Sequence, residues 1–320
     1  MPHNEANPHL AEACDRWAFG RLADSFRFQS VRALERVLPP PVLRRLLWPW
    51  VAVWVLPGRS QWKAFRPRWN RIPATLRHRD LELPDFLRRR LRSSLARFLT
   101  FWPDRLGAPH WQQRIRYEGL HHVLTVLNGG APAVLATLHF GVLFLLRYFL
   151  RARGIAASVL VAQDPKGRPR LQEMKNALMA SPGLPEVFTL DEVRAARRFL
   201  TPGHCLVVAV DFDRGRQVRV ATTHGTMRLA TGAMRLAQAS GARLIPCLAE
   251  EESPWRFVVH FGEPVPLQAG RDFGLAGQHL VNAFLPVISR RPTDWRRNLV
   301  DCWETTRPES TVSQTDGIIA

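Results

Sequence analysis

Residues 133–141 read AVLATLHFG, and residues 205–211 read CLVVAVD. Each stretch begins with a short, uninterrupted apolar run, which is typical of a strand buried on both faces of a parallel sheet. Helical patterns and further apolar runs alternate along the chain; the helical ones cover residues 117–127, 142–153, 171–180, 191–200 and 231–240, and the apolar ones cover 158–162, 244–248 and 257–261. This alternation predicts an α/β fold in which helices cover a mixed, largely parallel sheet.

A polar residue ends each of the two quoted runs: His139 ends the first and Asp211 the second. Ligands of open α/β sheets bind beyond the carboxyl ends of the strands, so both residues are candidates for a site. A histidine placed there, followed by the small Gly141, suits a general base. The alternatives are a hydrogen-bonded structural histidine and an aspartate that caps a turn. The sequence lacks the GxxxxGK, GxSxG and HExxH motifs of nucleotide hydrolysis, serine-hydrolase chemistry and zinc proteolysis.

The chain is strongly basic. Its 320 residues carry a formal net charge of +18, and 46% of them are hydrophobic, which is enough to bury a sizeable core. Lysines occupy three of the 45 basic positions and arginines the other 42. Guanidinium groups pair with phosphate and carboxylate, so anionic lipid, nucleic acid or an acidic carrier protein would suit this surface. A genome that favours GC would explain the choice of arginine over lysine, but not the net excess. No nucleic-acid-binding module is recognisable, so we expect no nucleic-acid partner.

The cysteines are far apart and form no Cys-x-x-Cys pair; they are Cys14, Cys205, Cys247 and Cys302. This spacing favours free thiols and predicts neither a disulfide framework nor a metal site. Residues 1–19 are polar and lack the basic and apolar regions of a secretory signal. We therefore expect that the protein is not exported by that route.

The first third of the chain is rich in tryptophan and arginine. Residues 46–56 (LLWPWVAVWVL) are too short to cross a membrane alone, and eight of the 11 tryptophans precede residue 112. Indole and guanidinium groups around a short apolar segment favour an interfacial membrane anchor, while a tryptophan-rich core helix is the alternative. A basic amphipathic helix continues this pattern through Arg88, Arg89, Arg90, Arg92 and Arg97, for which a solvated face is the competing explanation.

We accordingly divide the chain into three parts. Residues 1–110 are expected to form a helical, membrane-facing region that carries the anchor, residues 111–310 the α/β domain, and residues 311–320 a disordered tail.

Three segments together resemble a known family. Residues 119–141 (GLHHVLTVLNGGAPAVLATLHFG) combine a Gly-x-x-x-Leu helix, a glycine-rich turn and an apolar strand leading into His-Phe-Gly. Residues 208–248 contain an Asp-x-Asp-x-Gly turn, a basic loop, a Thr-Gly helix and an Ala-x-x-Ile-Pro strand, and residues 303–310 read WETTRPES. In order and spacing, from about residue 35 to 310, the chain resembles the lipid A late acyltransferases, the lauroyl/myristoyl branch of the lysophospholipid acyltransferase superfamily.

The resemblance implies transfer of a fatty acyl chain from acyl carrier protein or coenzyme A to a hydroxyl of a lipid or glycolipid. The enzyme would be peripheral or monotopic at the cytoplasmic face of a bacterial inner membrane, with membrane lipids and acyl carrier protein as partners and no cofactor or metal. The oligomeric state stays open. His139 would be the base, and Arg168 or Arg170 would bind phosphate, unless they belong to a solvated basic loop. Gly141 and Arg214 would contact substrate.

One position departs from the family. The superfamily signature is His-x-x-x-x-Asp/Glu, in which the acid orients the imidazole and stabilises its charged form, but here Phe144 stands five residues after His139. We expect Asp211 or Asp213 to supply the missing carboxylate. His224 is a second choice for the base. The apolar residues that follow His139, including Val142 and Leu146, would line an acyl groove or pack in the core. The rival interpretation is a degenerate homologue that binds lipid or carrier without turnover.

Overall fold

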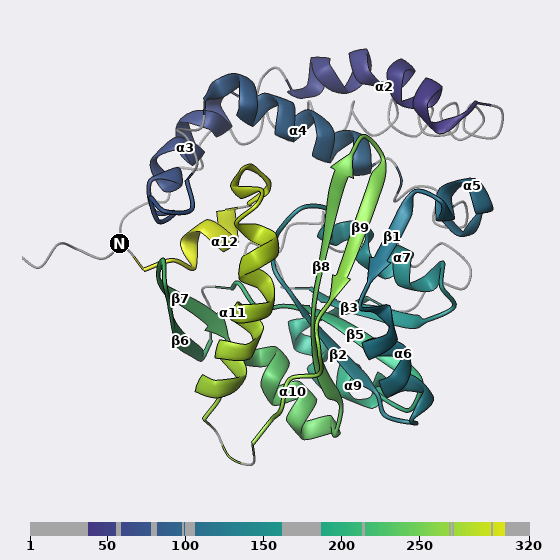
Figure 1. Cartoon of the computed structure of the whole chain (residues 1–320), viewed down its shortest axis with the longest axis vertical. Coiled ribbons are helices and arrows are strands. Elements are labelled where there is room, and N and C mark those ends of the chain that lie inside the picture. Colours follow the sequence, from purple (N-terminus) through teal and green to yellow (C-terminus); the bar gives the residue numbers. More distant parts are fainter. Residues whose placement is uncertain are drawn as a thin grey trace, which may run out of the picture.

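A seven-stranded sheet forms the centre of the described structure (Figure 1). The computed structural model describes residues 38–55, 59–77, 82–97, 99, 106–161, 187–212, 215–268, 270, 272–295 and 297–304. The strands lie in the order β1 (Ile115–Glu118), β9 (Arg256–Phe261), β8 (Arg243–Ser253), β2 (Ala133–Thr137), β5 (His204–Ala209), β3 (Ala156–Val161) and β4 (Val187–Thr189). Every neighbouring pair is parallel except β8 and β9. The prediction of an α/β fold with a largely parallel sheet is confirmed.

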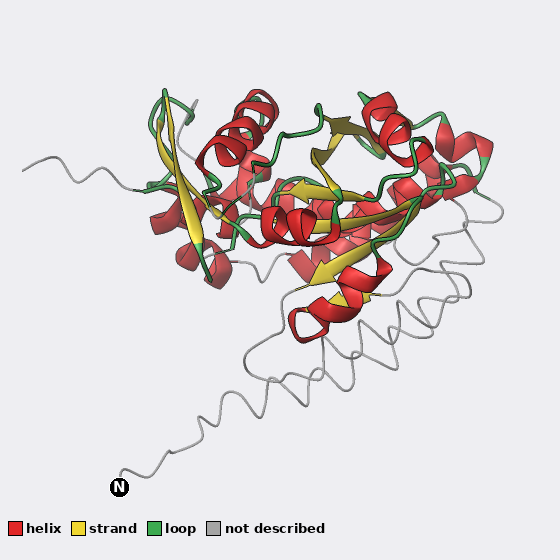
Figure 2. Cartoon of the chain, turned by 90° about the horizontal axis from the view of Figure 1, so that it is seen from below, coloured by secondary structure: helices red, strands yellow, loops and turns green. Residues whose placement is uncertain are grey.

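Helices pack on both faces of this sheet (Figure 2). Because side chains alternate along a strand, Val134 and Ala136 of β2 face one core, and Ala133 and Leu135 face the other. The first core contains residues of α9 (Val193–Phe199), α10 (Gly232–Ser240) and α11 (Gly274–Ile288). The second contains residues of α6 (Leu120–Asn128) and α7 (Leu146–Arg151). All five side chains of β2 are buried, which explains its uninterrupted apolar sequence.

A two-stranded hairpin lies outside the main sheet. Strand β6 (Gln217–Thr222) pairs antiparallel with β7 (Gly225–Ala230), and the hairpin packs on α11, where Gly277 lies against Val218 and Val220. This hairpin was not predicted from the sequence, although its strands contain the short alternating patterns Val218-Arg219-Val220 and Met227-Arg228-Leu229.

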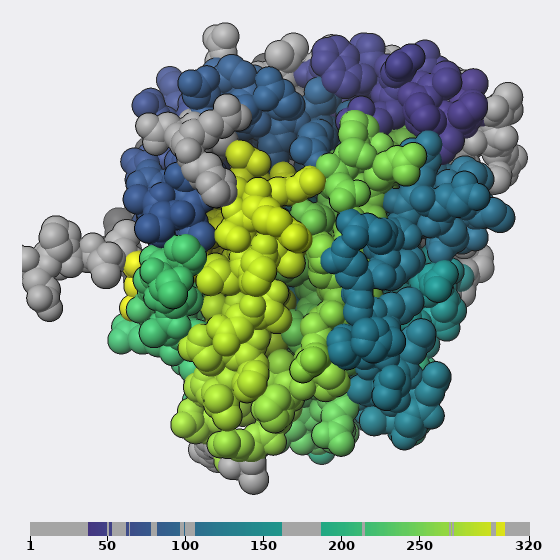
Figure 3. Space-filling view, in the orientation of Figure 1, coloured from purple at the N-terminus to yellow at the C-terminus, as the bar shows by residue number. Residues whose placement is uncertain are grey.

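In the described part of the chain, the helices α2 (Pro40–Val55), α3 (Arg59–Trp69) and α4 (Leu83–Arg97) precede the sheet, and the one-turn helix α5 (Pro109–Gln112) leads into β1. Helices α2, α3 and α4 form an outer layer beyond the β8–β9 hairpin (Figures 1 and 3). Helix α2 buries Leu43, Leu47 and Val51, spaced one turn apart, in the second core, and exposes half of Trp48. Trp69 of α3 is buried in the first core. Trp69 therefore fits the core-helix interpretation, whereas Trp48 does not, and the side chains of Trp50 and Trp54 lie outside the described part. None of the described helices is long and apolar enough to span a membrane.

Several boundaries differ from the prediction. Residues 117–127 were expected to be one helix, but Tyr117 pairs with Val259 in the sheet and α6 begins at Leu120. The break lies at Gly119, whose φ is +68° and where a Cβ atom would lie 2.1 Å from the carbonyl oxygen of Phe261. The helix expected at 142–153 begins instead with a 3₁₀ turn, Leu143–Leu145, before α7. The helix expected at 171–180 and the tail at 311–320 lie outside the described residues.

Two leucine substitutions test the placement of the core. Leu135→Ala in fully buried β2 should lower the free energy of unfolding by about 2–5 kcal/mol, because it removes a packed side chain and leaves a cavity. Leu275→Ala on α11, where the side chain is 51% exposed, should change it by less than about 0.5 kcal/mol. Denaturant unfolding measures both, and equal losses would contradict the placement of β2 at the sheet centre.

Candidate active site

The register between β2 and β5 decides where the two candidate residues meet. The strands pair in parallel from Ala133 with Cys205 to Thr137 with Ala209. When the same register continues two residues beyond the strands, His139 lies opposite Asp211, and the two are hydrogen-bonded across a sequence separation of 72 residues. The shared register therefore places the two residues side by side at the carboxyl ends of neighbouring central strands.

Asp211 holds both the ring and the main chain of His139. The Nδ1 atom of His139 lies 2.8 Å from Oδ1 of Asp211, and the main-chain N–H of His139 donates to Oδ2 over 2.7 Å. The carboxylate is fully buried, whereas the histidine side chain is 26% exposed. A carboxylate accepts hydrogen bonds, so Nδ1 carries the proton, and the lone pair of the neutral ring is on Nε2. This arrangement orients an imidazole for proton abstraction, as the aspartate does in a catalytic triad.

An aromatic ring supports this pair. The Phe212 ring meets the His139 ring edge to face, with centroids 5.0 Å apart and planes at 85°. Edge-to-face contact is a favoured arrangement of aromatic rings and limits the rotation of the imidazole. The sequence analysis did not single out Phe212, and its position between Asp211 and Asp213 was the available signal.

Gly141 lets the loop after His139 approach strand β8. Its φ is +49°, and a Cβ atom there would lie 2.3 Å from the carbonyl oxygen of Ala249. The N–H of Val142 donates to that same oxygen over 2.9 Å, and the N–H of Gly141 donates to the carbonyl oxygen of Asp294 over 3.3 Å. The described contacts therefore give Gly141 a role in loop geometry, while substrate contact stays a prediction.

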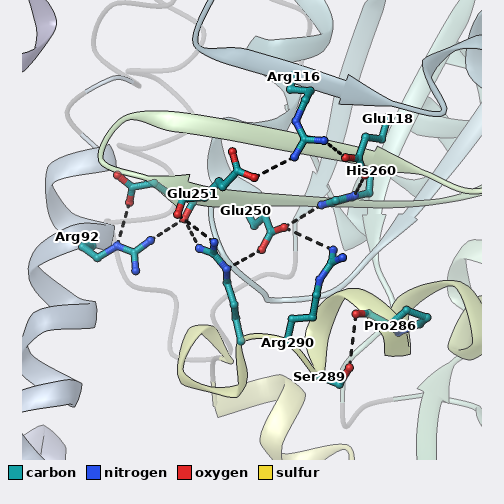
Figure 4. Close-up of polar contacts among 11 residues, drawn as sticks. Arg92, Arg116, Glu118, Glu250, Glu251, His260, Pro286, Ser289 and Arg290 are labelled. Atoms are coloured by element: carbon teal, nitrogen blue, oxygen red, sulfur yellow. Dashed lines mark hydrogen bonds and ion pairs between the residues drawn. The ribbon is translucent and has the colours of Figure 1, made fainter.

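Next to this loop, the end of β8 carries a cluster of charged residues (Figure 4). We call it the β8 ionic cluster; it comprises Arg92, Arg116, Glu118, Glu250, Glu251, Glu252, His260, Arg290 and Arg291. His260 bridges two carboxylates, with Nε2 3.0 Å from Glu250 and Nδ1 2.7 Å from Glu118. Burial alone would raise the pKa of Glu250, but the hydrogen bond to His260 and the charge of Arg291 lower it below its usual range. The cluster thus keeps a buried carboxylate ionised beside the site loop.

Arginines of α4 secure the other side of the loop. Arg89 donates to the carbonyl oxygens of Thr293 and Trp295, each over 2.7 Å, and Arg92 donates to that of Glu251 over 2.6 Å. Burial lowers the pKa of Arg89 to about 10. The interpretation of this arginine run as a lipid-facing or solvated face is therefore wrong for Arg89 and Arg92. In contrast, Arg88 is exposed and pairs with Asp85 at 2.8 Å.

The remaining predicted residues divide into two groups. Arg168, Arg170, Asp213 and Arg214 lie outside the described residues. His224 lies at the β6–β7 turn, where its Nδ1 is 2.9 Å from Oγ1 of Thr75, and no described hydrogen bond joins it to His139. The apolar residues after His139 divide as well: Val142 and Leu146 are buried in the second core, and Phe144 is half-buried beside it.

Comparisons with known proteins add no family assignment. No model of a known protein family matches the chain, and no curated protein matches it. Within the described part of the chain, no group of three or more histidine, cysteine or acidic residues is arranged to hold a metal ion. The His139–Asp211 pair and the motifs quoted above are therefore the features of this chain that point to a function.

Two glycine substitutions test the close approach at the site loop. Gly141→Ala should destabilise the fold by about 1–3 kcal/mol more than Gly154→Ala, because the new methyl group would overlap a main-chain oxygen of β8. Gly154 has a similar φ of +75° but no atom within 4 Å of the added Cβ, so it controls for backbone strain alone. Denaturant unfolding gives both values; equal losses would show that the loop does not need the contact with Ala249.

Proposed function

We propose that this protein is an acyltransferase that moves a fatty acyl chain from acyl carrier protein or coenzyme A to a hydroxyl of a lipid or glycolipid. The observation that supports this most directly is the His139–Asp211 pair, because Asp211 supplies the orienting carboxylate that the sequence motif lacks at Phe144. The sequence resemblance supplies the reaction class, and the pair supports it, because an imidazole oriented by a carboxylate suits the central proton transfer.

The reaction follows from the two protonation sites of His139. Nε2 takes the proton of the acceptor hydroxyl as that oxygen attacks the thioester carbonyl carbon, and Asp211 stabilises the imidazolium that forms. The tetrahedral intermediate then collapses, the carbon–sulfur bond breaks, and Nε2 returns the proton to the departing thiolate. The products are the ester and the free thiol, and His139 is neutral again.

Asp211 can replace the motif acid because both would serve the same atom. An acid five residues after the histidine would reach the imidazole from the following turn, whereas Asp211 reaches it from the neighbouring strand at 2.8 Å. Phe144, which stands at the position of the motif acid, packs against the second core instead.

The rival candidate is a homologue that binds lipid or acyl carrier without turnover. Phe144 in the place of the acid is the observation that favours it. The first candidate transfers acyl chains and needs His139 and Asp211 to do so, whereas the second transfers none.

We propose a peripheral position at the cytoplasmic face of a bacterial inner membrane. Helix α2 exposes Val42, Leu46 and Trp48, at 42%, 52% and 50%, next to the exposed Arg45. Exposed apolar and indole groups beside a guanidinium suit the headgroup layer of an anionic membrane. The formal net charge of +18 also favours attraction to anionic lipid and to an acidic carrier protein.

Transfer of a radiolabelled acyl chain from acyl carrier protein into membrane lipid tests the reaction. His139→Ala should abolish labelling, and Asp211→Asn should reduce the rate by about 10⁴-fold, because the imidazole would lose the carboxylate that orients it. His224→Ala and Asp213→Asn are the matched controls and should retain labelling near that of the wild type.

Equal labelling by the wild type and His139→Ala would contradict the catalytic role of His139. No labelling by the wild type, with varied acceptors and with coenzyme A thioesters as donors, would favour the non-catalytic candidate.

Flotation with vesicles that contain anionic phospholipid tests the membrane face. Leu46→Glu and Trp48→Glu should each reduce the membrane-bound fraction by roughly tenfold, because a buried apolar side chain of this size contributes about 1.5 kcal/mol or more. Leu275→Glu is the control, since Leu275 is equally exposed at 51% on α11. An unchanged bound fraction in the α2 variants would contradict the anchoring role.

A further inference from the structure

A buried arginine on α7 lacks an anionic partner. Arg147 is only 5% exposed, and it lies in a helix whose neighbouring residues Leu146, Tyr148, Phe149 and Leu150 are all buried. A charge removed from water needs a compensating charge or a full set of hydrogen bonds. Among the described residues no carboxylate pairs with Arg147.

The guanidinium of Arg147 is instead turned onto its neighbour. Its Nη2 donates to the hydroxyl of Tyr148 over 2.6 Å, and its central carbon lies 4.5 Å from the centre of the Tyr148 ring. Tyr148 is a neutral partner at ordinary pH, because burial raises the pKa of its hydroxyl above the usual value. The Nη1 atom of Arg147 is buried and has no hydrogen-bond partner within the described part of the chain.

Arg151 repeats this feature one helical turn later. Its Nη1 atom is also buried and without a hydrogen-bond partner in the described structure. Side chains four residues apart lie on the same face of a helix, with Cβ atoms about 5–6 Å apart. The two guanidinium groups can therefore reach one ligand together. Two partly buried arginines elsewhere are paired: Arg89 donates to two carbonyl oxygens, and Arg291 lies 3.2 Å from Glu250. Arg44, Arg77 and Arg228 each leave a buried Nε atom unpartnered in the described structure, whereas Arg147 and Arg151 leave a terminal Nη1 unpartnered.

We propose that Arg147 and Arg151 form a binding site for a phosphate group, with a phosphomonoester as the best match. A phosphomonoester carries about −1.5 to −2 charges at pH 7, which balances two guanidinium groups. Guanidinium also pairs with phosphate through two parallel N–H bonds, and the unpartnered Nη1 atoms supply such donors. Helix α7 follows the His139 loop directly, so the site would hold one end of a substrate whose other end reacts at His139. The inference depends on the proposed function only for the source of the phosphate, which is either a lipid headgroup or coenzyme A.

Thermal unfolding of the full chain at increasing inorganic phosphate, with chloride at matched ionic strength, tests the site. We expect phosphate to raise the melting temperature of the wild type, and Arg147→Met or Arg151→Met to weaken the apparent affinity by about tenfold or more. Without phosphate, Arg147→Met should melt no lower than the wild type, because methionine fills a similar volume and removes an unpaired buried charge. Arg153→Met is the matched control, since Arg153 is exposed just beyond α7, lies over the Tyr117 ring, and should keep the wild-type response.

The same assay with other ligands identifies the source of the phosphate, and the same assay with His139→Ala distinguishes phosphate binding from catalysis. If coenzyme A raises the melting temperature and dephospho-coenzyme A, which lacks the 3′-phosphate, does not, the phosphate belongs to the acyl donor. If short-chain phosphatidic acid raises it and phosphatidylcholine does not, the phosphate belongs to a lipid headgroup. His139→Ala should keep the phosphate response even though it loses transfer. Two results would overturn the proposal: the same phosphate response in wild type, Arg147→Met and Arg151→Met, or no response in the wild type. If Arg147→Met fails to fold, Arg151→Met and Arg147→Lys provide the same comparison.

Discussion

The parallel pairing of β2 with β5 brings His139 within 2.8 Å of Asp211. Since the pleat alternates with a period of two, a slip of one residue in this register would turn one of the two side chains to the opposite face of the sheet. The packing of β2 favours this register, because a slip of one residue would exchange the side chains that face the two cores. The contact between His139 and Asp211 therefore depends on the stability of the pairing between β2 and β5.

The loop after His139 depends on residues from three distant parts of the chain. Gly141 approaches Ala249 of β8, and its N–H is bonded to Asp294. Arg89 of α4 in turn holds the carbonyl oxygens on either side of Asp294. Helix α4 therefore supports the site loop, because its arginines Arg89 and Arg92 tie the amino-terminal region to it. Burial of Arg89 lowers its pKa to about 10, and its hydrogen bonds to the carbonyl oxygens of Thr293 and Trp295 offset part of the cost of that burial.

The sequence predicted what depends on local pattern and missed what depends on tertiary contact. Uninterrupted apolar runs located β2 and β5, and with them the positions of His139 and Asp211. The hairpin β6–β7 was missed because its short patterns, Val218-Arg219-Val220 and Met227-Arg228-Leu229, lie in a stretch that reads as a basic loop, whereas β6 packs on α11. The inward turn of Arg89 and Arg92 was missed because a run of arginines carries no signal for which ones find buried carbonyl oxygens.

Asp211 does more than replace the acid that the motif lacks at Phe144. An acid on the turn after the histidine would move with that turn, whereas Asp211 follows the central strand β5 by two residues and is fully buried. It also bonds the main-chain N–H of His139 at 2.7 Å, so one carboxylate fixes both the backbone and the ring of the base. A carboxyl group buried in this way needs both donors, and losing the imidazole would leave it with one fewer. His139 and Asp211 therefore stabilise each other, which ties the integrity of the strand ends to the chemistry proposed there.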